Sequence, residues 1–499
     1  MQSVPVLLLG FVAIYIIQKL VRYWSALRSI QNLPGYRILF RDVSAASFLG
    51  SIPGVAPGFN ANFQDKHSIA LSTADADVAK EITSSRYRFP KPIDQYEALS
   101  VYGLNIVASE GDDWKRYRKI AAPAFSDRNN KLVWEETVKI MDGLFDEVWK
   151  NQDVVTVDHC LDITLPIALF VIGVAGFGKS MTWHDEDQGI PAGHSLSFKD
   201  SLHTASVDIT IKLLFPDILL KYGTPRLRRV RKAYQELGVY MAEMVQERTA
   251  SEKAERHDLF TNLLEANNDD SDGVRLTSDE LIGNIFIFLL AGHETTAHTL
   301  CFTFALLAMH EDEQEKLFQH IKTTLPDGRM PTYDDMPRLT YSMAVFYETL
   351  RLFPPAPLVP KISSEDTVLT VGNIHGQKRV VPVAKGTRVI VHIPGLHYNP
   401  RYWDDPESFR PSRFLSPDWN RDAFLPFSAG ARACLGRKFF ETEGIAALTM
   451  LVSRYKIKVK YEPEFAAESF EQRYNRILKA YTRLTLTPER VPLTFLRRS

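Results

Sequence analysis

Residues 427–436 (FSAGARACLG) place a single cysteine in a setting that suits a metal-bound thiolate. A cysteine binds iron as the thiolate, so its surroundings must stabilise a negatively charged sulfur. Gly430 and Gly436 allow the backbone to approach Cys434 closely. The segment 436–448 predicts a helix, and its amino end would direct free N–H groups and a positive dipole at the sulfur. The pattern therefore predicts that Cys434 is a metal ligand.

Two neighbours of Cys434 indicate that the metal is the iron of a haem. Arg432 is a fork-shaped donor suited to a carboxylate such as a haem propionate, and Phe427 can cover the sulfur and keep water away from it. The alternative is a buried structural cysteine, which most lone cysteines are. A packed core, however, does not require Phe, Gly, Arg, Cys and Gly at these spacings, so haem ligation is the preferred interpretation.

The same residues carry a family resemblance. Phe427, Gly430, Arg432, Cys434 and Gly436 occupy every fixed position of the signature F-x-x-G-x-R-x-C-x-G, so the chain resembles the cytochrome P-450 family of haem-thiolate monooxygenases. The resemblance implies haem b (iron protoporphyrin IX) as the cofactor and a mostly α fold with a smaller β-rich part. The segment from residue 368 to 391, rich in Val and Thr and interrupted by glycines, is typical of those strands.

A second motif lies inside the longest helical pattern, residues 277–309. Thr295 can donate a hydrogen bond to the carbonyl of Ala291, which loosens the helix and makes room for water, and Glu294 could supply that water with protons. Breaking the O–O bond of dioxygen at a haem requires two protons. The segment resembles the family's A-G-x-[D/E]-T motif, which implies catalytic roles for Thr295 and Glu294. A polar kink in a core helix is the alternative.

A zinc hydrolase is a rival interpretation of the same segment, because His293-Glu294 begins like the motif H-E-x-x-H. That motif needs a second histidine four residues later, on the same face of the helix. Position 297 is alanine, and His298 lies about 140° round the helix from His293. A zinc site is therefore disfavoured.

A buried ion pair is expected beneath the haem. Glu348 and Arg351 are three residues apart on one helix face, and their apolar surroundings favour a further partner. They resemble the family's E-x-x-R motif, which implies pairing with Arg413 of a later segment. Ser412 stands where the family has glutamate in that segment, and the three-way lock of Glu348, Arg351 and Arg413 does not depend on it.

Three more residues are expected at the haem propionates. Trp114 and Arg118 are four apart on one helix and resemble the family's W-x-x-x-R pair, which contacts the propionates. Lys361 stands where many relatives place another propionate-binding basic residue. All three are therefore predicted to bind the cofactor.

The substrate is expected to lie along the helix that carries Thr295. Steps of four, seven, eight and eleven residues back from Thr295 give one face, and the predicted pocket residues on it are Ala291, Phe288, Ile287 and Asn284. This wall is apolar with one amide, which suits a lipophilic molecule bearing an oxygen function. A terpenoid, a sterol-like compound, a fatty acid or a polyketide fits this description.

Bulk properties exclude several other classes. The formal net charge of −1 over 499 residues argues against a nucleic-acid-binding protein. Three cysteines are too few for a disulfide framework and indicate a reducing compartment. The motifs run from Trp114 to Gly436 in the family's order, so we expect residues 36–499 to form a single haem-thiolate catalytic domain.

The amino end predicts a membrane anchor. Residues 4–17 are an uncharged apolar run, and counting to residue 24 gives about the ~20 residues that span a bilayer. Lys19 and Arg22 follow the run, so the positive-inside rule leaves the catalytic domain cytosolic. A cleaved signal peptide would instead begin with basic residues. We expect a single-pass anchor over residues 1–26, a hinge over 27–35 and a location in the endoplasmic reticulum.

The resemblance implies a monooxygenase that inserts one atom of dioxygen into a lipophilic substrate by hydroxylation or epoxidation, in fungal secondary metabolism. No G-x-G-x-x-G opens a strand–helix unit, so electrons are expected from NADPH through a diflavin reductase. A basic docking face for that partner is predicted from five residues, namely Lys115, Arg116, Lys119, Arg437 and Lys438. A reductase-independent haem-thiolate isomerase or dehydratase is the alternative enzyme, and a haem carrier or sensor is the non-enzymatic one.

Overall fold

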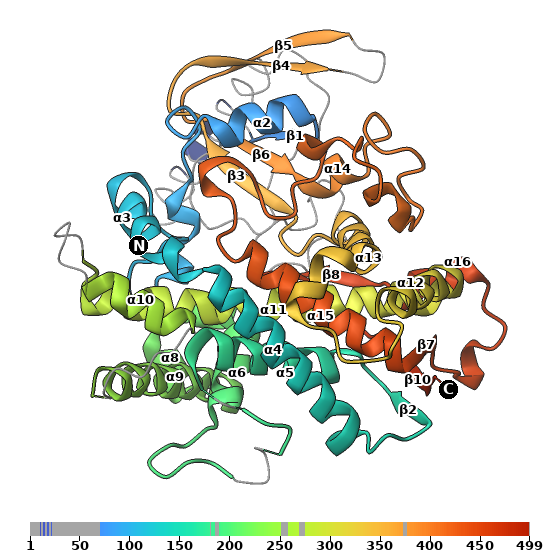
Figure 1. Cartoon of the computed structure of the whole chain (residues 1–499). Coiled ribbons are helices and arrows are strands. Elements are labelled where there is room, and N and C mark those ends of the chain that lie inside the picture. Colours follow the sequence, from blue (N-terminus) through green and yellow to red (C-terminus); the bar gives the residue numbers. More distant parts are fainter. Residues whose placement is uncertain are drawn as a thin grey trace.

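The computed structural model describes residues 70–179, 181–184, 189–250, 258–268, 275–372 and 377–498, with isolated positions between 10 and 21. Apart from those isolated positions, the predicted anchor and hinge lie outside the described residues. The described part is mostly helical with several small sheets, as expected (Figure 1).

The longer helices form the body of the molecule. They are α3 (Gly111–Ala121), α4 (Asp127–Gly143), α5 (Leu161–Val171), α6 (Phe198–Val207), α9 (Pro225–Ala250), α10 (Leu259–Asn268), α11 (Ser278–Met309), α12 (Glu311–Thr324), α13 (Thr340–Leu352) and α15 (Arg437–Arg454). The shorter ones are α2 (Ala76–Ser84), α7 (Ile209–Leu214), α8 (Asp217–Tyr222), α14 (Ile393–His397) and α16 (Phe470–Ile477).

Helix α11 is the central element, and it packs against α5, α13 and α15. A capping box of Thr277 and Glu280 fixes its start. It is the one described helix that is long and apolar enough to cross a membrane, but most of it is buried inside the protein, as in the core helix of a globular domain. Because α11 is buried on nearly all sides, an exposed residue along it indicates a surface that a ligand could reach.

The strands form two three-stranded sheets and two hairpins in the described residues. The sheets have the orders β1-β6-β3 and β2-β10-β7, and the hairpins are β4-β5 and β8-β9. Their bounds are β1 (Ala70–Thr73), β2 (Val154–Val157), β3 (Leu358–Ile362), β4 (Thr367–Gly372), β5 (Lys378–Val383), β6 (Arg388–His392), β7 (Tyr455–Val459), β8 (Ala480–Thr482), β9 (Leu486–Pro488) and β10 (Leu493–Arg497).

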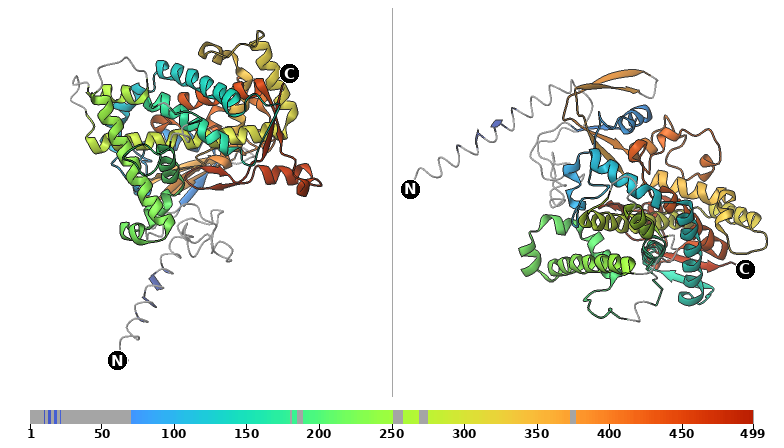
Figure 2. Two further views of the ribbon diagram at one scale, coloured as in Figure 1. Left: turned by 90° about the horizontal axis from the view of Figure 1, so that it is seen from below. Right: turned by 60° about the vertical axis from the view of Figure 1, so that its left-hand side comes forward.

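The sheets occupy the margins of the helical body. Strands β1, β3, β4, β5 and β6 lie at one end of the molecule and helices α8 and α9 at the other (Figure 1). The carboxyl end of the chain lies beside β10 (Figure 2). The predicted strand region therefore corresponds to β4, β5 and β6. Most of the predicted site residues lie on helices or in the loops beside them, and Lys361 lies on β3.

Candidate active site

The loop before α15 holds Cys434 in a fixed conformation. The Cys434 N–H donates to the Phe427 carbonyl over 2.9 Å. Gly430 has φ +66°, and a Cβ there would lie 2.3 Å from the carbonyl oxygen of Thr83 on α2. Only glycine combines this left-handed conformation with such a close approach. Gly436 is the N-cap residue of α15, and a Cβ added at this position would lie 4.0 Å from the Cys434 sulfur.

Cys434 differs from the other cysteines in its exposure. Cys160 and Cys301 are buried, whereas the Cys434 side chain is exposed. Surrounding protein atoms still desolvate the thiol and raise its pKa, while the Gly436 N–H and the cations Arg437 and Arg118 act in the opposite direction. A thiol that is enclosed by protein yet open on one side is suited to a ligand that covers it.

A cluster of cations lies beside this loop. The Arg432 guanidinium is 2.7 Å from Glu110, and burial lowers the pKa of Arg432. Lys361 is 3% exposed, and burial lowers its pKa as well. Burial also lowers the pKa of Lys91 to about 7, with repulsion from Arg432 and Lys361 adding to the effect. One carboxylate thus faces three desolvated cations.

This imbalance fits the haem that the cysteine loop implies. Desolvated cations need anionic partners, and the two propionates of a haem would supply them. The Arg432 Nε atom is one of the buried polar atoms of the described residues that have no hydrogen-bond partner. Lys91 and Glu110 are members of this cluster that the sequence motifs did not indicate. The placement of Lys91 between two prolines was the available signal, but it carries no specific chemistry.

Trp114 and Arg118 join the same cluster. The Trp114 ring is 4% exposed and lies under the Arg432 guanidinium, with 4.1 Å between the guanidinium carbon and the ring centroid. Arg118 lies 5.9 Å from the same centroid and donates to the Ala433 carbonyl over 3.4 Å. The structure therefore brings Trp114, Arg118, Lys361 and Arg432 to one place beside Cys434.

The middle of α11 has one open face. Ala291 is exposed, and Phe288 and Thr295 are partly exposed, on a helix that is otherwise largely buried. The Thr295 hydroxyl donates to the Ala291 carbonyl over 2.9 Å, as predicted. Phe125 connects this face to the cysteine loop, because it contacts the Phe288 ring at 5.6 Å between centroids and lies 3.7 Å from the Cβ position of Gly436.

Glu294, next to Thr295 in the chain, is buried beside the β8–β9 turn and does not lie on the open face. The carboxyl group is 8% exposed, and burial raises its pKa to about 7. The hydroxyl of Thr485, in the β8–β9 turn, lies 3.4 Å from Glu294 Oε2. Glu294 is therefore an acid that holds its proton near neutrality, next to the residue that lines the open face.

The structure places the amino-terminal end of the predicted pocket wall away from the open face of α11. Asn284 is 1% exposed, its Oδ1 accepts from the Ile106 N–H over 3.0 Å, and its Nδ2 donates to the Glu280 carbonyl over 2.8 Å. Ile287 is 3% exposed. The chain near residue 103 packs directly on α11 at Gly283, where a Cβ would lie 2.6 Å from the Gly103 carbonyl oxygen. This close packing removes the Asn284 amide from any substrate.

The structure brings the three lock residues together. The Arg351 guanidinium donates to both oxygens of Glu348 over 2.8 Å, and both side chains are fully buried. Arg413 Nε donates to Glu348 Oε1 over 3.1 Å. The carbonyls of His397 and Pro406 accept from the remaining arm of Arg351, so the buried charges are satisfied.

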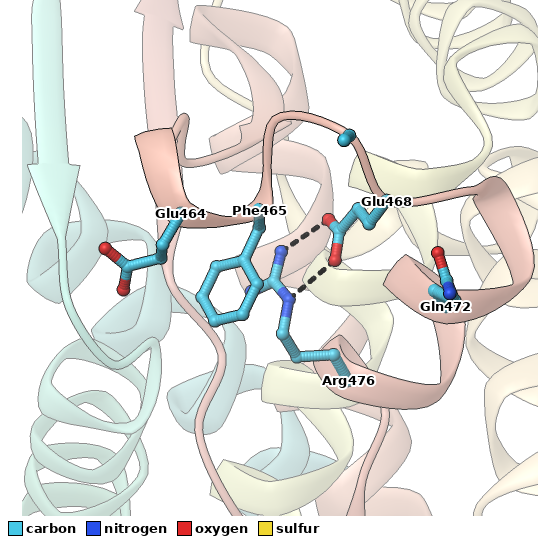
Figure 3. Close-up of a pocket in the computed structure, with 6 residues that line it drawn as sticks. Glu464, Phe465, Glu468, Gln472 and Arg476 are labelled. Atoms are coloured by element: carbon cyan, nitrogen blue, oxygen red, sulfur yellow. Dashed lines mark hydrogen bonds and ion pairs between the residues drawn. The ribbon is translucent and has the colours of Figure 1, made fainter.

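One surface crevice contributes nothing to this site. Its lining comes from a single stretch of the chain, namely Glu464, Phe465, Ala467, Glu468, Gln472 and Arg476. Figure 3 shows Arg476 paired with Glu468 and lying against the ring of Phe465. Arg476 and Glu468 are the two side chains that Figure 3 joins, and the stretch contains none of the predicted site residues.

Comparisons with known proteins agree with this geometry. A family model described as Cytochrome P-450 matches residues 64–474. Cytochrome P-450 monooxygenase 124 of Postia placenta is 50% identical over 520 aligned residues, which cover 100% of both chains. Cytochrome P-450 monooxygenase prx9 of Penicillium rubens is 32% identical over 77% of this chain and 73% of its own.

A bacterial relative and a solved structure extend the comparison. Cyclooctat-9-en-7-ol 5-monooxygenase of Streptomyces melanosporofaciens is 30% identical over 72% of this chain and 74% of its own. A crystal structure of a cytochrome P-450 haem domain superposes with a TM-score of 0.71 at 25% identity, covering 86% of this chain and 88% of that chain. With an exposed cysteine in the family's loop, the matching fold and a full-length relative at half identity, this chain belongs to the cytochrome P-450 family and is a monooxygenase.

Proposed function

We propose that the chain binds haem b and that the Cys434 thiolate would be the protein ligand of its iron. The loop residues Phe427, Gly430 and Gly436 would shape the space around the sulfur, and the propionates would be held by Trp114, Arg118, Lys361 and Arg432. When bound, the haem supplies dioxygen activation and the transfer of one oxygen atom to an organic substrate. One observation carries this proposal: the Cys434 thiol is exposed beside three desolvated cations that have, among the described residues, only the Glu110 carboxylate as a partner of opposite charge.

Thr295 and Glu294 would deliver protons during this reaction. The Thr295 hydroxyl stands on the open face of α11, where it can orient a water molecule. Glu294, with a pKa of about 7, can release and regain a proton near neutral pH. Neither side chain needs to contact the substrate for this role.

The substrate class follows from the open face of α11. Phe288 and Ala291 present apolar surface beside Thr295, which suits a lipophilic molecule that is hydroxylated or epoxidised. The Streptomyces relative has the name of an enzyme acting on cyclooctat-9-en-7-ol. We infer a role in secondary metabolism, with a terpenoid as the leading substrate class.

Electrons would come from NADPH through a diflavin reductase. The predicted basic face is only partly available, because Lys115 pairs with Asp112 and Arg116 pairs with Glu280, each at 2.6 Å. Arg437, 51% exposed, pairs with Glu441 at 2.8 Å. Docking of an acidic partner beside the cysteine loop would therefore depend on exchange of these ion pairs more than on free positive charge.

We also infer attachment to the endoplasmic reticulum membrane by residues 1–26, with residues 36–499 as one catalytic unit in the cytosol. A surface patch supports membrane contact. Its exposed apolar side chains are those of Leu213, Leu214, Phe215, Ile218, Leu219 and Tyr222, in α7, α8 and the turn between them. A contiguous patch of this kind is typical of a protein or membrane contact.

Reconstitution tests the function. The full chain, loaded with haem in vesicles, would be supplied with NADPH, a diflavin reductase and a panel of terpenoids under isotopically labelled dioxygen. We expect a product that carries one labelled oxygen and requires both NADPH and the reductase. Conversion that proceeds without either would instead identify an isomerase or dehydratase.

A further inference from the structure

A buried hydrogen-bonded chain links Glu294 to the β8–β9 hairpin. The Thr485 hydroxyl, in the turn of this hairpin, lies 3.4 Å from Glu294 Oε2 and 2.9 Å from Nδ1 of His298. All three side chains are at most 8% exposed. Glu294 and Thr485 are 191 residues apart in the chain, so only the fold brings this acid and this hydroxyl together.

The hydroxyl can serve either protonation state of the acid. A threonine hydroxyl has one donor hydrogen and two acceptor lone pairs. It can donate to Glu294 when the carboxylate is ionised and accept from Glu294 when the acid is protonated. His298 is one turn after Glu294 on α11, and burial lowers its pKa to about 3, so it stays neutral and supplies a second partner for the hydroxyl in both states.

The hairpin turn that carries Thr485 is itself fixed. The Leu486 N–H donates to the Pro355 carbonyl over 2.9 Å, and the Arg483 N–H donates to the Thr485 carbonyl over 3.0 Å. Thr487 donates its hydroxyl to that same Thr485 carbonyl over 3.2 Å. The hydroxyl is therefore presented to α11 by a turn that is tied to the loop after α13.

We propose that Thr485, held by His298, is the positioning residue for the Glu294 carboxyl group. The inference rests on the proposed function of Glu294 as a proton donor. Glu294 and Thr295 are successive residues, about 100° apart round the helix, so the carboxyl group is kept on the hairpin side of α11 while Thr295 faces the open side. Thr485 thus fixes the position of the Glu294 carboxyl group and influences its pKa.

The acidity of Glu294 supports this assignment. Burial raises its pKa to about 7, whereas the Thr485 hydrogen bond and the positive charge of Arg483 act in the opposite direction. The other titratable groups around His298 are the imidazoles of His293 on α11 and His159 before α5. Burial lowers the pKa of each, to about 4 for His293, so they stay neutral near pH 7. Loss of the Thr485 hydroxyl alone should therefore raise the pKa of Glu294 further.

Infrared titration of the haem-loaded resting enzyme tests this without turnover. The carboxylic acid band that is present in the wild type and absent from Glu294→Gln would be followed against pH. We expect the midpoint to move upward in Thr485→Val and to stay near the wild-type value in Thr485→Ser, which keeps the hydroxyl. Thr303→Val is the matched control, since it removes a buried hydroxyl of α11 that bonds to the Thr299 carbonyl and the Thr349 hydroxyl and takes no part in the hairpin turn. An unchanged midpoint in Thr485→Val, or an equal shift in Thr303→Val, overturns the proposal.

A second measurement separates positioning from a structural role. In Thr485→Val we expect product per NADPH to fall several-fold with an unchanged substrate dissociation constant. In the Glu294→Gln background the same change should have no further effect, because the hydroxyl acts through the acid. An equal loss in both backgrounds contradicts the proposal. Absence of any NADPH-dependent product in the wild type would contradict the proposed function, while the infrared titration would still decide the link between Thr485 and Glu294.

Discussion

At the scale of single residues, the site depends on which side chains the fold leaves uncovered. Cys434 is exposed while the other two cysteines are buried, and Thr295 is partly exposed while Thr296 and Thr299, which follow it on α11, are buried. The same residue type therefore has different chemistry according to its surroundings. Substitutions matched for residue type can separate the functional residue from its structural counterparts.

The first such pair concerns the cysteines. Cys434→Ser should abolish the long-wavelength Soret band of the reduced, carbon-monoxide-bound protein, because a serine hydroxyl does not ionise to replace the thiolate. Cys301→Ala should keep the band, since Cys301 is a buried packing residue on α11. The absorption spectrum is the measurement, and a Cys434→Ser protein that retained the band would refute the ligand assignment.

The second pair concerns the threonines of α11. Thr295→Ala should still consume NADPH but divert much of it to hydrogen peroxide, because proton delivery is impaired and substrate contacts are not. Thr299→Ala is the control, since Thr299 makes the same type of bond to the carbonyl four residues earlier but is fully buried. Product per NADPH and the substrate-induced spectral shift would be measured. A dissociation constant weakened tenfold, or roughly 1.4 kcal/mol, would place Thr295 in the substrate pocket instead.

We expect Glu294 to give the enzyme a pH dependence. Because burial raises its pKa to about 7, the carboxyl group is protonated below this pH and loses its proton above it. If the protonated form is the donor, product per NADPH should fall as the pH rises through about 7. The measurement is the coupling ratio across this range, and Glu294→Gln should give a low ratio that no longer varies there. A wild-type ratio that rises through the same range would contradict the assignment.

At the scale of elements, the sequence motifs predicted those parts of the site that lie close together in the chain. The capped helix α11, the Thr295 bond to Ala291 and the pairing of Glu348 with Arg351 follow from spacing of three or four residues. Asn284 was predicted on the pocket wall, whereas in the structure its side chain bonds to a segment almost 180 residues earlier that packs on α11. Helical periodicity identifies the residues that share one face of a helix, but packing against distant segments determines which of those residues a ligand can reach.

The same limit explains which residues were missed. Lys91 and Glu110 acquire their significance from Arg432, more than 300 residues later, and Thr485 from Glu294. None of them belongs to a short motif. Arg413, by contrast, was predicted through the family resemblance, since nothing in the local sequence connects it to Glu348.

The buried lock provides a stability prediction. Glu348→Gln removes the carboxylate that pairs with both Arg351 and Arg413. The free energy of unfolding should fall by about 3–5 kcal/mol, because the two arginine charges stay buried without that partner. Glu365→Gln is the control, as it breaks a pair with Arg88 that is largely exposed and worth about 0–1 kcal/mol. Thermal unfolding of the haem-loaded proteins would be compared. Equal midpoints for the two variants would mean that the lock does not stabilise the fold.

At the scale of the whole molecule, polar chemistry and apolar surface lie in different places. The proposed catalytic groups lie along α11, inside the helical body (Figure 1), and in the loop before α15, whereas the apolar side chains of α7 and α8 are exposed at the molecular surface. A lipophilic substrate partitions into a bilayer, so a membrane contact made by the protein's own surface would bring the enzyme to the phase in which its substrate is concentrated. The patch would then act together with the predicted anchor.

Removal of residues 1–26 allows the patch to be tested by itself. We expect the truncated protein to keep its haem spectrum and to retain weak binding to vesicles of neutral lipid. Ile218→Glu with Leu219→Glu should reduce this binding by about tenfold or more, because each buried aliphatic side chain contributes about 1.5–3 kcal/mol. Met330→Glu with Leu415→Glu is the matched control, since it adds the same two negative charges at side chains that are 44% and 45% exposed and lie outside α7 and α8. Cosedimentation with vesicles measures the effect. Equal loss in the control would indicate that added negative charge, and not the patch, governs binding, and an unchanged double variant would remove α7 and α8 from the membrane contact.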